Sequence, residues 1–306
     1  MIRDAFLVNH RMPVGGVLCC RKHYGSTERK RRAWQRQSLS FCCRIPVRKK
    51  KYRGTDMMNA YQALAESYDR LTNDVDYHAV VDFYFQILQK EGLKPRTAVD
   101  LACGTGSVAM LMAQNGMQVT AVDMSEEMLV QATQKAAGMD NPPLFVCQQL
   151  EKLHLPRGVD LAVCALDSID YITDPRDCQE AIKRIYKALN PGGCFIFDVN
   201  TPEKLQAMDE QVFLDEDDDV YCVWRGSFDP QTNICSYAMD LFQRQGELWS
   251  RSFEEHCEYA YSQQMLEEYL RNAGFTSIEV YADRQMTKPR PGEQRIYLKA
   301  RKGRIK

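Results

Sequence analysis

The sequence predicts an α/β fold, and three features of its apolar pattern support that prediction. Short apolar runs alternate with helical patterns between residues 97 and 199. These runs contain few polar positions, as in parallel strands that helices cover on both faces. After Asn200 the pattern changes to long runs of alternating polar and apolar residues, which is typical of antiparallel strands. We therefore expect a parallel sheet with helices on both faces, joined to an antiparallel sheet.

The first half of the chain supplies the parallel part. Two helical patterns, at residues 59–71 and 77–92, precede the first strand, and the second ends at Gly92. Ser125 is followed by two glutamates, which suits a helix N-terminus because its side chain caps open amides and acids favour the positive end of the dipole. Strands are predicted at residues 97–102, 118–123, 144–149, 159–166 and 194–199, with helices beginning at Ser107, Ser125 and Arg176.

The second half supplies the antiparallel part. Turn signals at Asp229-Pro230 and Gln245-Gly246 separate three long alternating runs, at residues 218–228, 233–245 and 247–261. We expect an inserted sheet over residues 205–262 and a solvated acidic segment at residues 214–220. A helix at residues 263–275 and two strands at residues 277–282 and 295–302 close the chain.

The N-terminal segment differs in charge from the rest of the chain. Residues 1–56 carry 15 Lys and Arg against 3 Asp and Glu, whereas residues 57–306 carry 25 against 38. The leader, residues 1–56, offers little to bury and is expected to be disordered. A transit peptide, an RNA-binding arm, or a segment absent from the natural protein are open alternatives. Nucleic-acid binding is not expected of the acidic body, residues 57–306.

Cysteine usage and hydropathy narrow the class of protein further. Four of the twelve cysteines stand as adjacent pairs in the leader, which does not match the spacing that lets two thiolates reach one zinc ion. No metal is therefore expected. No run approaches the roughly 18 to 20 apolar residues of a membrane span, and the start of the chain lacks a secretory apolar segment. These features predict a cytoplasmic protein.

A glycine turn follows the first predicted strand and precedes a helix. Gly104 and Gly106 bring backbone amides and a positive helix end to the carboxyl edge of the sheet, where such folds bind ligands. Asp123 follows the second strand and suits a ribose, in either an NAD or an S-adenosylmethionine site. Asp100 separates the two readings, because an acid there disfavours a pyrophosphate and suits the ammonium group of S-adenosylmethionine.

The same stretch carries a family resemblance. "VDLACGTGSVAMLMAQNGMQVTAVDMSEEML" resembles the first two motifs of class I S-adenosylmethionine-dependent methyltransferases, and "LNPGGCFIFDV" resembles their turn into the fifth strand. "YQALAESYDRLTNDVDY", "LDSIDYI" and "RSFEEHCEYAY" are similar to the bacterial YqeM-like branch. The resemblance spans residues 57–306 and implies a Rossmann-like, seven-stranded, mostly parallel sheet whose last strand is antiparallel, with an inserted antiparallel β-sheet as a cap.

The resemblance also implies a set of cofactor-binding residues. Two of them depart from the family pattern: Ala102 stands where many members have glycine, and Gln149 where an acid usually accepts the adenine amino proton. Tyr61 and Tyr68 resemble aromatic residues that close over the cofactor, although packing of a helix on the sheet explains them equally well. The implied set comprises Asp100, Ala102, Gly104 and Gly106 around the methionine part, Asp123 at the ribose, and Met124, Gln148, Gln149 and Leu150 at the adenine.

Candidate catalytic residues follow the fourth and fifth strands and occupy the inserted sheet. Asp167 and Asp170 are candidate bases after strand four, and Asn200 is a candidate positioning group after strand five. Strand alternation places His256 on one face with Glu254 and Glu258. That face is either part of the active site, with His256 as a base, or a polar outer face of the sheet.

The inserted sheet also offers candidate substrate-binding residues, although structural packing alone would explain its aromatic residues. The candidates are Trp224, Arg225, Arg251, Tyr259 and Tyr261. Together these features predict methyl transfer to a nitrogen or oxygen of a small molecule. An RNA or protein methyltransferase and a non-catalytic regulatory protein that binds S-adenosylmethionine are the alternatives, and the oligomeric state is left open.

Overall fold

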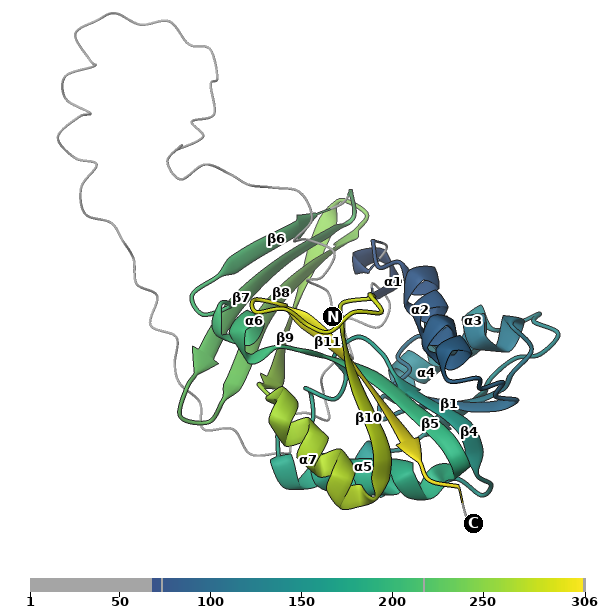
Figure 1. Cartoon of the computed structure of the whole chain (residues 1–306). Helices are drawn as coiled ribbons and strands as arrows, with labels where there is room; N and C mark the ends of the chain where they lie inside the picture. Colours follow the sequence, from purple (N-terminus) through teal and green to yellow (C-terminus); the bar gives the residue numbers. More distant parts are fainter. Residues whose placement is uncertain (1–67, 73, 217, 305–306) are drawn as a thin grey trace, which may run out of the picture.

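The computed structural model describes residues 68–72, 74–216 and 218–304. The leader, most of the first predicted helix and Tyr61 lie outside the described residues. Two sheets organise the rest of the chain, one of seven strands and one of four (Figure 1). Apart from positions 73 and 217, none of the helices between residues 68 and 304 combines the length and apolar character needed to cross a membrane.

The larger sheet has the strand order β10-β11-β5-β4-β1-β2-β3. β11 runs antiparallel to both of its neighbours, β5 and β10, whereas β5, β4, β1, β2 and β3 pair in parallel. The predicted seven-stranded, mostly parallel sheet is therefore confirmed. Its strands are β1 Thr97–Leu101, β2 Gln118–Asp123, β3 Leu144–Cys147, β4 Val159–Cys164, β5 Leu189–Asn200, β10 Phe275–Ala282 and β11 Arg295–Lys302.

Helices cover both faces of this sheet, as its apolar strands require. α2 (Tyr77–Lys90) and α3 (Ser107–Gln114) pack with one set of strand residues, and α5 (Pro175–Ala188) and α7 (Gln263–Ala273) pack with the other (Figure 1). Successive residues of β4 illustrate the alternation, because Leu161 and Val163 belong to the first core and Ala162 and Cys164 to the second. The remaining helices are α1 Tyr68–Leu71, α4 Glu126–Lys135, the 3-10 helix η4 Leu150–Lys152 and α6 Pro202–Gln206.

The smaller sheet is antiparallel, in the order β6-β7-β8-β9, and is inserted between β5 and α7. Its inner face packs on α6, on Met128 of α4 and on Tyr68, so the cap meets the larger sheet near the ends of the strands that carry the predicted site. Its strands are β6 Val212–Glu216, β7 Val220–Asp229, β8 Ile234–Gln245 and β9 Leu248–Tyr259.

The structure refines one sequence-based expectation about the cap and decides between two alternatives for another. The acids Glu216, Asp218 and Asp219 of the segment at residues 214–220 are exposed, as expected. Asp215 in strand β6 is the exception, because strand pairing turns it inward next to Cys222; Asp217 lies outside the described residues. The face that carries Glu254, His256 and Glu258 is buried, which excludes the alternative of a polar outer face. The alternation itself is confirmed, since Arg251 and Phe253 on the opposite face are exposed.

Candidate active site

The turn after β1 requires unusual backbone geometry at three alternate residues. Ala102, Gly104 and Gly106 all have left-handed φ angles, of 52°, 53° and 79°. A Cβ atom at Gly106 would lie 3.0 Å from the ring of Phe145 and 3.2 Å from Ala132, so only glycine fits there. A Cβ atom at Gly104 would meet nothing within 4 Å. The chain therefore leaves space beside Gly104, and Ala102 adopts a left-handed conformation that is strained for a residue with a Cβ atom.

Asp100 is a buried carboxyl at the base of this turn. Its side chain is 1% exposed, and within the described part of the chain its Oδ2 atom has no hydrogen-bond partner. Burial raises the pKa of Asp100 to about 8; the backbone amide of Ala109 opposes that shift and the charge of Asp123 adds to it. An unpartnered buried carboxyl is costly by itself and is matched by a cationic ligand.

A pocket opens beside this turn and brings several predicted residues together. Asp100, Ala102, Gly104 and Tyr68 line it, as the cofactor interpretation expects. Gly106 is not among its lining residues, although it shapes the turn. Seven further residues complete the lining, namely Tyr77, Cys103, Thr105, Ser107, Val108, Ala165 and Leu166.

Asp123 connects the end of β2 to the glycine turn. Its Oδ2 accepts a hydrogen bond from the backbone amide of Gly104 at 2.7 Å, and its Oδ1 accepts one from the amide of Ser125 at 2.9 Å. Burial raises its pKa. Each carboxylate oxygen has two lone pairs, so Asp123 can still accept bonds from ribose hydroxyls. Met124, the next residue, is 42% exposed and offers an apolar surface beyond it.

The residues predicted for the adenine edge lie in the loop after β3 and have local partners. Gln148 bonds twice to the backbone of His154, accepting from its amide at 2.9 Å and donating to its carbonyl at 3.3 Å. The side-chain oxygen of Gln149 accepts a bond from Lys152 Nζ. Leu150 begins η4 and is buried in the core. The adenine role of these three residues stays a prediction.

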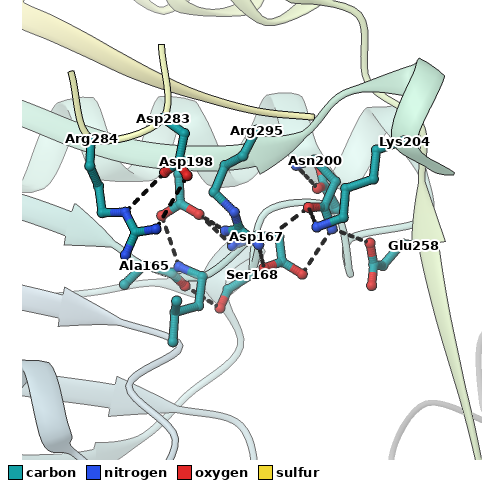
Figure 2. A network of polar contacts seen from close by, with 12 residues as sticks. Ala165, Asp167, Ser168, Asp198, Asn200, Lys204, Glu258, Asp283, Arg284 and Arg295 are labelled. Atoms are coloured by element: carbon teal, nitrogen blue, oxygen red, sulfur yellow. Dashed lines mark hydrogen bonds and ion pairs between the residues drawn. The ribbon is translucent and has the colours of Figure 1, made fainter. Parts of the chain in front are cut away.

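A second polar group of residues lies on the other side of the pocket wall, and Figure 2 shows it from close by. Arg295 Nη2 donates to Asp167 Oδ1 at 2.6 Å, and Asn200 Nδ2 donates to Asp167 Oδ2 at 3.1 Å. The Asn200 amide also donates to Glu258 Oε2 at 2.8 Å, and Lys204 Nζ donates to Asn200 Oδ1 at 2.8 Å. We call this set, together with Asp198, the polar cluster; every member is buried.

Comparison with known proteins identifies the chemistry. Residues 98–193 match the family described as a methyltransferase domain. The putative methyltransferase YqeM of Bacillus subtilis is 31% identical over 246 residues, which are 80% of this chain and 98% of that protein. The chain belongs to the S-adenosylmethionine-dependent methyltransferases. The structure of such a methyltransferase from Clostridium acetobutylicum is 32% identical, with a TM-score of 0.73 over 80% of this chain and 100% of that chain. The sugar N-methyltransferase KedS8 from Streptoalloteichus, 16% identical with a TM-score of 0.65 over 84% of this chain and 99% of that chain, shares the fold.

S-adenosylmethionine is therefore the cofactor of this methyltransferase, and the pocket fits it. Asp100 Oδ2 supplies a buried acceptor for an ammonium group, and the open side of Gly104 lets a ligand approach the backbone. Within residues 68–304, positions 73 and 217 aside, no group of three His, Cys, Asp or Glu side chains is arranged to hold a metal ion.

The three candidate bases of the methyltransferase are all buried and contact other polar groups, but Asp170 Oδ1 has no hydrogen-bond partner within the described residues. Asp167 accepts bonds at both oxygens, as described above. Asp170 Oδ2 accepts from the backbone amide of Asn200 at 2.8 Å, and burial raises the pKa of Asp170 well above its usual range, with the charges of Glu258 and Asp167 adding. His256, 2% exposed, has its Nε2 3.2 Å from Glu254 Oε2 and its ring 5.9 Å from that of Trp224.

Glu258 is a candidate base that sequence reasoning did not single out. It is 2% exposed, and burial, followed by the charge of Asp167, raises its pKa to about 7, while the bond from Asn200 opposes the shift. A group with a pKa near neutrality exchanges protons readily at working pH. The sequence did offer one indication of this role, because the alternation along β9 places Glu258 on the same face as His256.

The structure divides the predicted substrate-binding residues among three places. Trp224 lies on the inner face of the cap beside His256. Arg225 and Arg251 lie on the outer face, where both bind Asp240, so the structure does not bring them to the other candidates. Tyr261 is buried and donates its hydroxyl to the carbonyl of Ile172, with the ring of half-buried Tyr259 4.5 Å away.

Several residues of the site were not predicted. Tyr77 and Leu166 line the pocket, but an aromatic residue at a helix start and a leucine at a strand end give no distinctive signal. Asp198 could have been found from the sequence. A single carboxyl group within an apolar strand that helices cover on both faces requires a buried partner. Its partner, Arg295, begins an apolar strand 97 residues later.

Proposed function

We propose that this methyltransferase transfers the methyl group of S-adenosylmethionine to a nitrogen or oxygen of a small molecule. The acceptor binds between the carboxyl edge of the larger sheet and the inner face of the cap. One observation carries the proposal: the loop after β4 serves both sides of the site. Ala165 and Leu166 line the cofactor pocket, and Asp167, the next residue, belongs to the polar cluster that reaches Glu258 on β9. An acceptor at the polar cluster therefore lies next to the cofactor.

On this proposal, the cofactor is held mainly by the turn after β1. Asp100 binds the ammonium group, the backbone around Ala102 and Gly104 surrounds the methionine part, and Asp123 binds the ribose. Tyr68, which is buried and lines the pocket, packs against the cofactor. Met124 covers one face of the adenine, and residues 148–150 bind its edge.

When bound, S-adenosylmethionine supplies an electrophilic methyl group on a positively charged sulfur. The protein then has to align the nucleophile and exclude water, which the buried polar cluster favours. Asn200 and Asp167 position the acceptor, because Arg295 and Lys204 hold them rigidly. Glu258 accepts a proton at Oε1 when the nucleophile arrives protonated, since its Oε2 already binds Asn200. Trp224, on the inner face of the cap, provides an apolar contact for the acceptor.

Isotope-resolved product profiling tests this function. The full chain is incubated with a bacterial metabolite extract and S-adenosylmethionine labelled with ¹³C in its methyl group. We expect labelled small molecules that the Asp100→Asn variant does not form. Label found only in RNA or protein, or no label transferred while S-adenosylhomocysteine binds normally, would contradict the small-molecule proposal.

A further inference from the structure

The loop after β4 contains an unusual pair of residues. Leu166 and Asp167 are consecutive and both have left-handed φ angles, of 56° and 53°. Non-glycine residues rarely adopt this conformation, and a leucine that does so is a clear outlier. Such strain persists only where the surrounding structure holds it in place, and it concentrates at functional sites. The contacts that hold this pair therefore matter for the site.

Asp198 holds both strained residues through their backbone. Its Oδ1 accepts the amide of Leu166 at 2.8 Å, and its Oδ2 accepts the amide of Asp167 at 3.0 Å. Successive amides in a turn form a concave site that suits an anion. Here that position is occupied by the Asp198 carboxyl group, a side chain of β5 that is completely buried in the sheet. Ser168 adds a bond from its hydroxyl to the carbonyl of Ala165 at 2.8 Å, on the same turn (Figure 2).

Arg295 completes the arrangement from the neighbouring strand. It stands opposite Asn200 in the antiparallel pairing of β11 with β5. One guanidinium nitrogen binds Asp198, and the other binds Asp167 at 2.6 Å and Asn200 Oδ1 at 3.2 Å (Figure 2). Arg295 thus links the carboxylate that holds the backbone of the loop to the side chain of the loop itself. Its rigid fork of donors suits this double contact.

The loop held in this way forms a wall of the cofactor pocket. Ala165 and Leu166 line the pocket together with residues of the turn after β1, whereas Asp198 and Arg295 do not line it. We propose that Asp198 and Arg295 are positioning residues, which act on the cofactor through the strained pair Leu166–Asp167. The inference rests on the proposed function, since it takes this pocket as the place where S-adenosylmethionine binds.

Binding of S-adenosylhomocysteine to the full chain tests the proposal by calorimetry. In Asp198→Asn one of the two amides loses its acceptor, because an asparagine has only one oxygen. We expect the Kd to rise by up to about tenfold, because the bond is lost within the protein and only part of its free energy is transmitted to the pocket. Arg295→Met, the second variant, is expected to weaken binding by a similar factor. Hydrogen exchange at the amides of Leu166 and Asp167 should become faster in Asp198→Asn.

Lys299 on the same strand supplies a matched control. It is completely buried and binds Glu91 and Glu279, each at 2.9 Å, but none of these residues lines the pocket. Lys299→Met therefore removes a buried cation of β11 without touching the loop, and we expect the thermal midpoint to fall while the Kd stays within about twofold of the wild type.

Three results would overturn the inference. Equal loss of affinity in Lys299→Met would show a general effect of stability. If both Asp198→Asn and Arg295→Met bound S-adenosylhomocysteine with wild-type affinity, the positioning role would be wrong, but the proposed function would stand. Absence of S-adenosylhomocysteine binding by the wild-type chain would instead overturn the proposed function, and the inference with it.

Discussion

The cofactor pocket and the polar cluster are built in different ways. The largest part of the pocket lining is one local segment: the turn after β1, with its glycines and its left-handed φ angles, lies between residues 97 and 107, and side chains from elsewhere complete the lining. The polar cluster consists of side chains that come from β5, β9, β11, α6 and the loop after β4. A short local motif thus reveals the first site, whereas the second exists only once the sheet has formed.

Although the turn after β1 is shaped by its backbone, we expect a single side-chain change at Asp100 to impair cofactor binding strongly. We expect Asp100→Asn to weaken S-adenosylhomocysteine binding roughly 30- to 100-fold at about pH 8, the loss of a buried charged hydrogen bond. Because the pKa of Asp100 is about 8, its proton must leave before it can pair with an ammonium group. Wild-type affinity should therefore rise by up to about tenfold per pH unit from about pH 6 to about pH 8.

The Asp100→Asn variant should lose this pH dependence while gaining thermal stability. A carboxyl whose pKa is raised by folding contributes stability at acid pH and loses it as the pH rises through the folded pKa, here about 8. Removing that carboxyl should therefore raise the thermal midpoint at about pH 8. Calorimetry across pH, together with thermal unfolding, measures both effects. Unchanged affinity in the variant would show that the ammonium group binds elsewhere.

A methyl group at Gly106 should impair the same pocket through the backbone. The Cβ atom of Gly106→Ala would press on Phe145 at 3.0 Å and on Ala132 at 3.2 Å and force the turn to move. We expect about tenfold weaker S-adenosylhomocysteine binding, measured by calorimetry.

Gly116 offers the matched control for Gly106. Its φ angle is also left-handed, at 85°, but nothing lies within 4 Å of its Cβ position and it lies outside the pocket. Gly116→Ala should cost a similar backbone strain, about 1 kcal/mol, without changing the Kd. Equal effects on binding in the two variants would mean that general destabilisation, not the shape of the turn, governs affinity.

On the acceptor side, Glu258→Gln should change catalysis and leave cofactor binding intact. With a pKa of about 7, Glu258 gains its charge as the pH rises through neutrality, so the wild-type rate on a protonated nucleophile should rise over the same range. The variant should be roughly tenfold to a hundredfold slower at about pH 8 and lack that rise. The pH profile of labelled product formation measures this. A wild-type profile in the variant would assign proton transfer to another group or to none.

The difference between the two sites also explains what could be predicted from the sequence. Strand and helix patterns predicted the parallel and antiparallel parts of the fold, and the motif around Asp100 predicted the cofactor, because each depends on neighbouring residues. The number of strands in the larger sheet, its antiparallel last strand and the cap were implied by the family resemblance. Arg225 and Arg251 appeared equivalent to Trp224, but strand alternation turns them to the outer face. Asp198 and Arg295 meet only because β11 inserts beside β5, which local patterns do not specify.

The smallest expected effect on cofactor affinity concerns the side chain of Gln149. Gln149 is a neutral amide whose oxygen already binds Lys152, and the family resemblance implies an acid at this position that faces the adenine amino group. A carboxylate forms the stronger hydrogen bond, so we expect Gln149→Asp to tighten S-adenosylhomocysteine binding by about threefold to tenfold. Gln149→Asn has the same length without the charge, and should bind no more tightly than the wild type. If both variants bind more weakly than the wild type, residue 149 does not contact the adenine amino group, and the interaction with Lys152 is instead what shapes the loop. If only the aspartate tightens binding, a single neutral substitution in the chain limits its affinity for the cofactor.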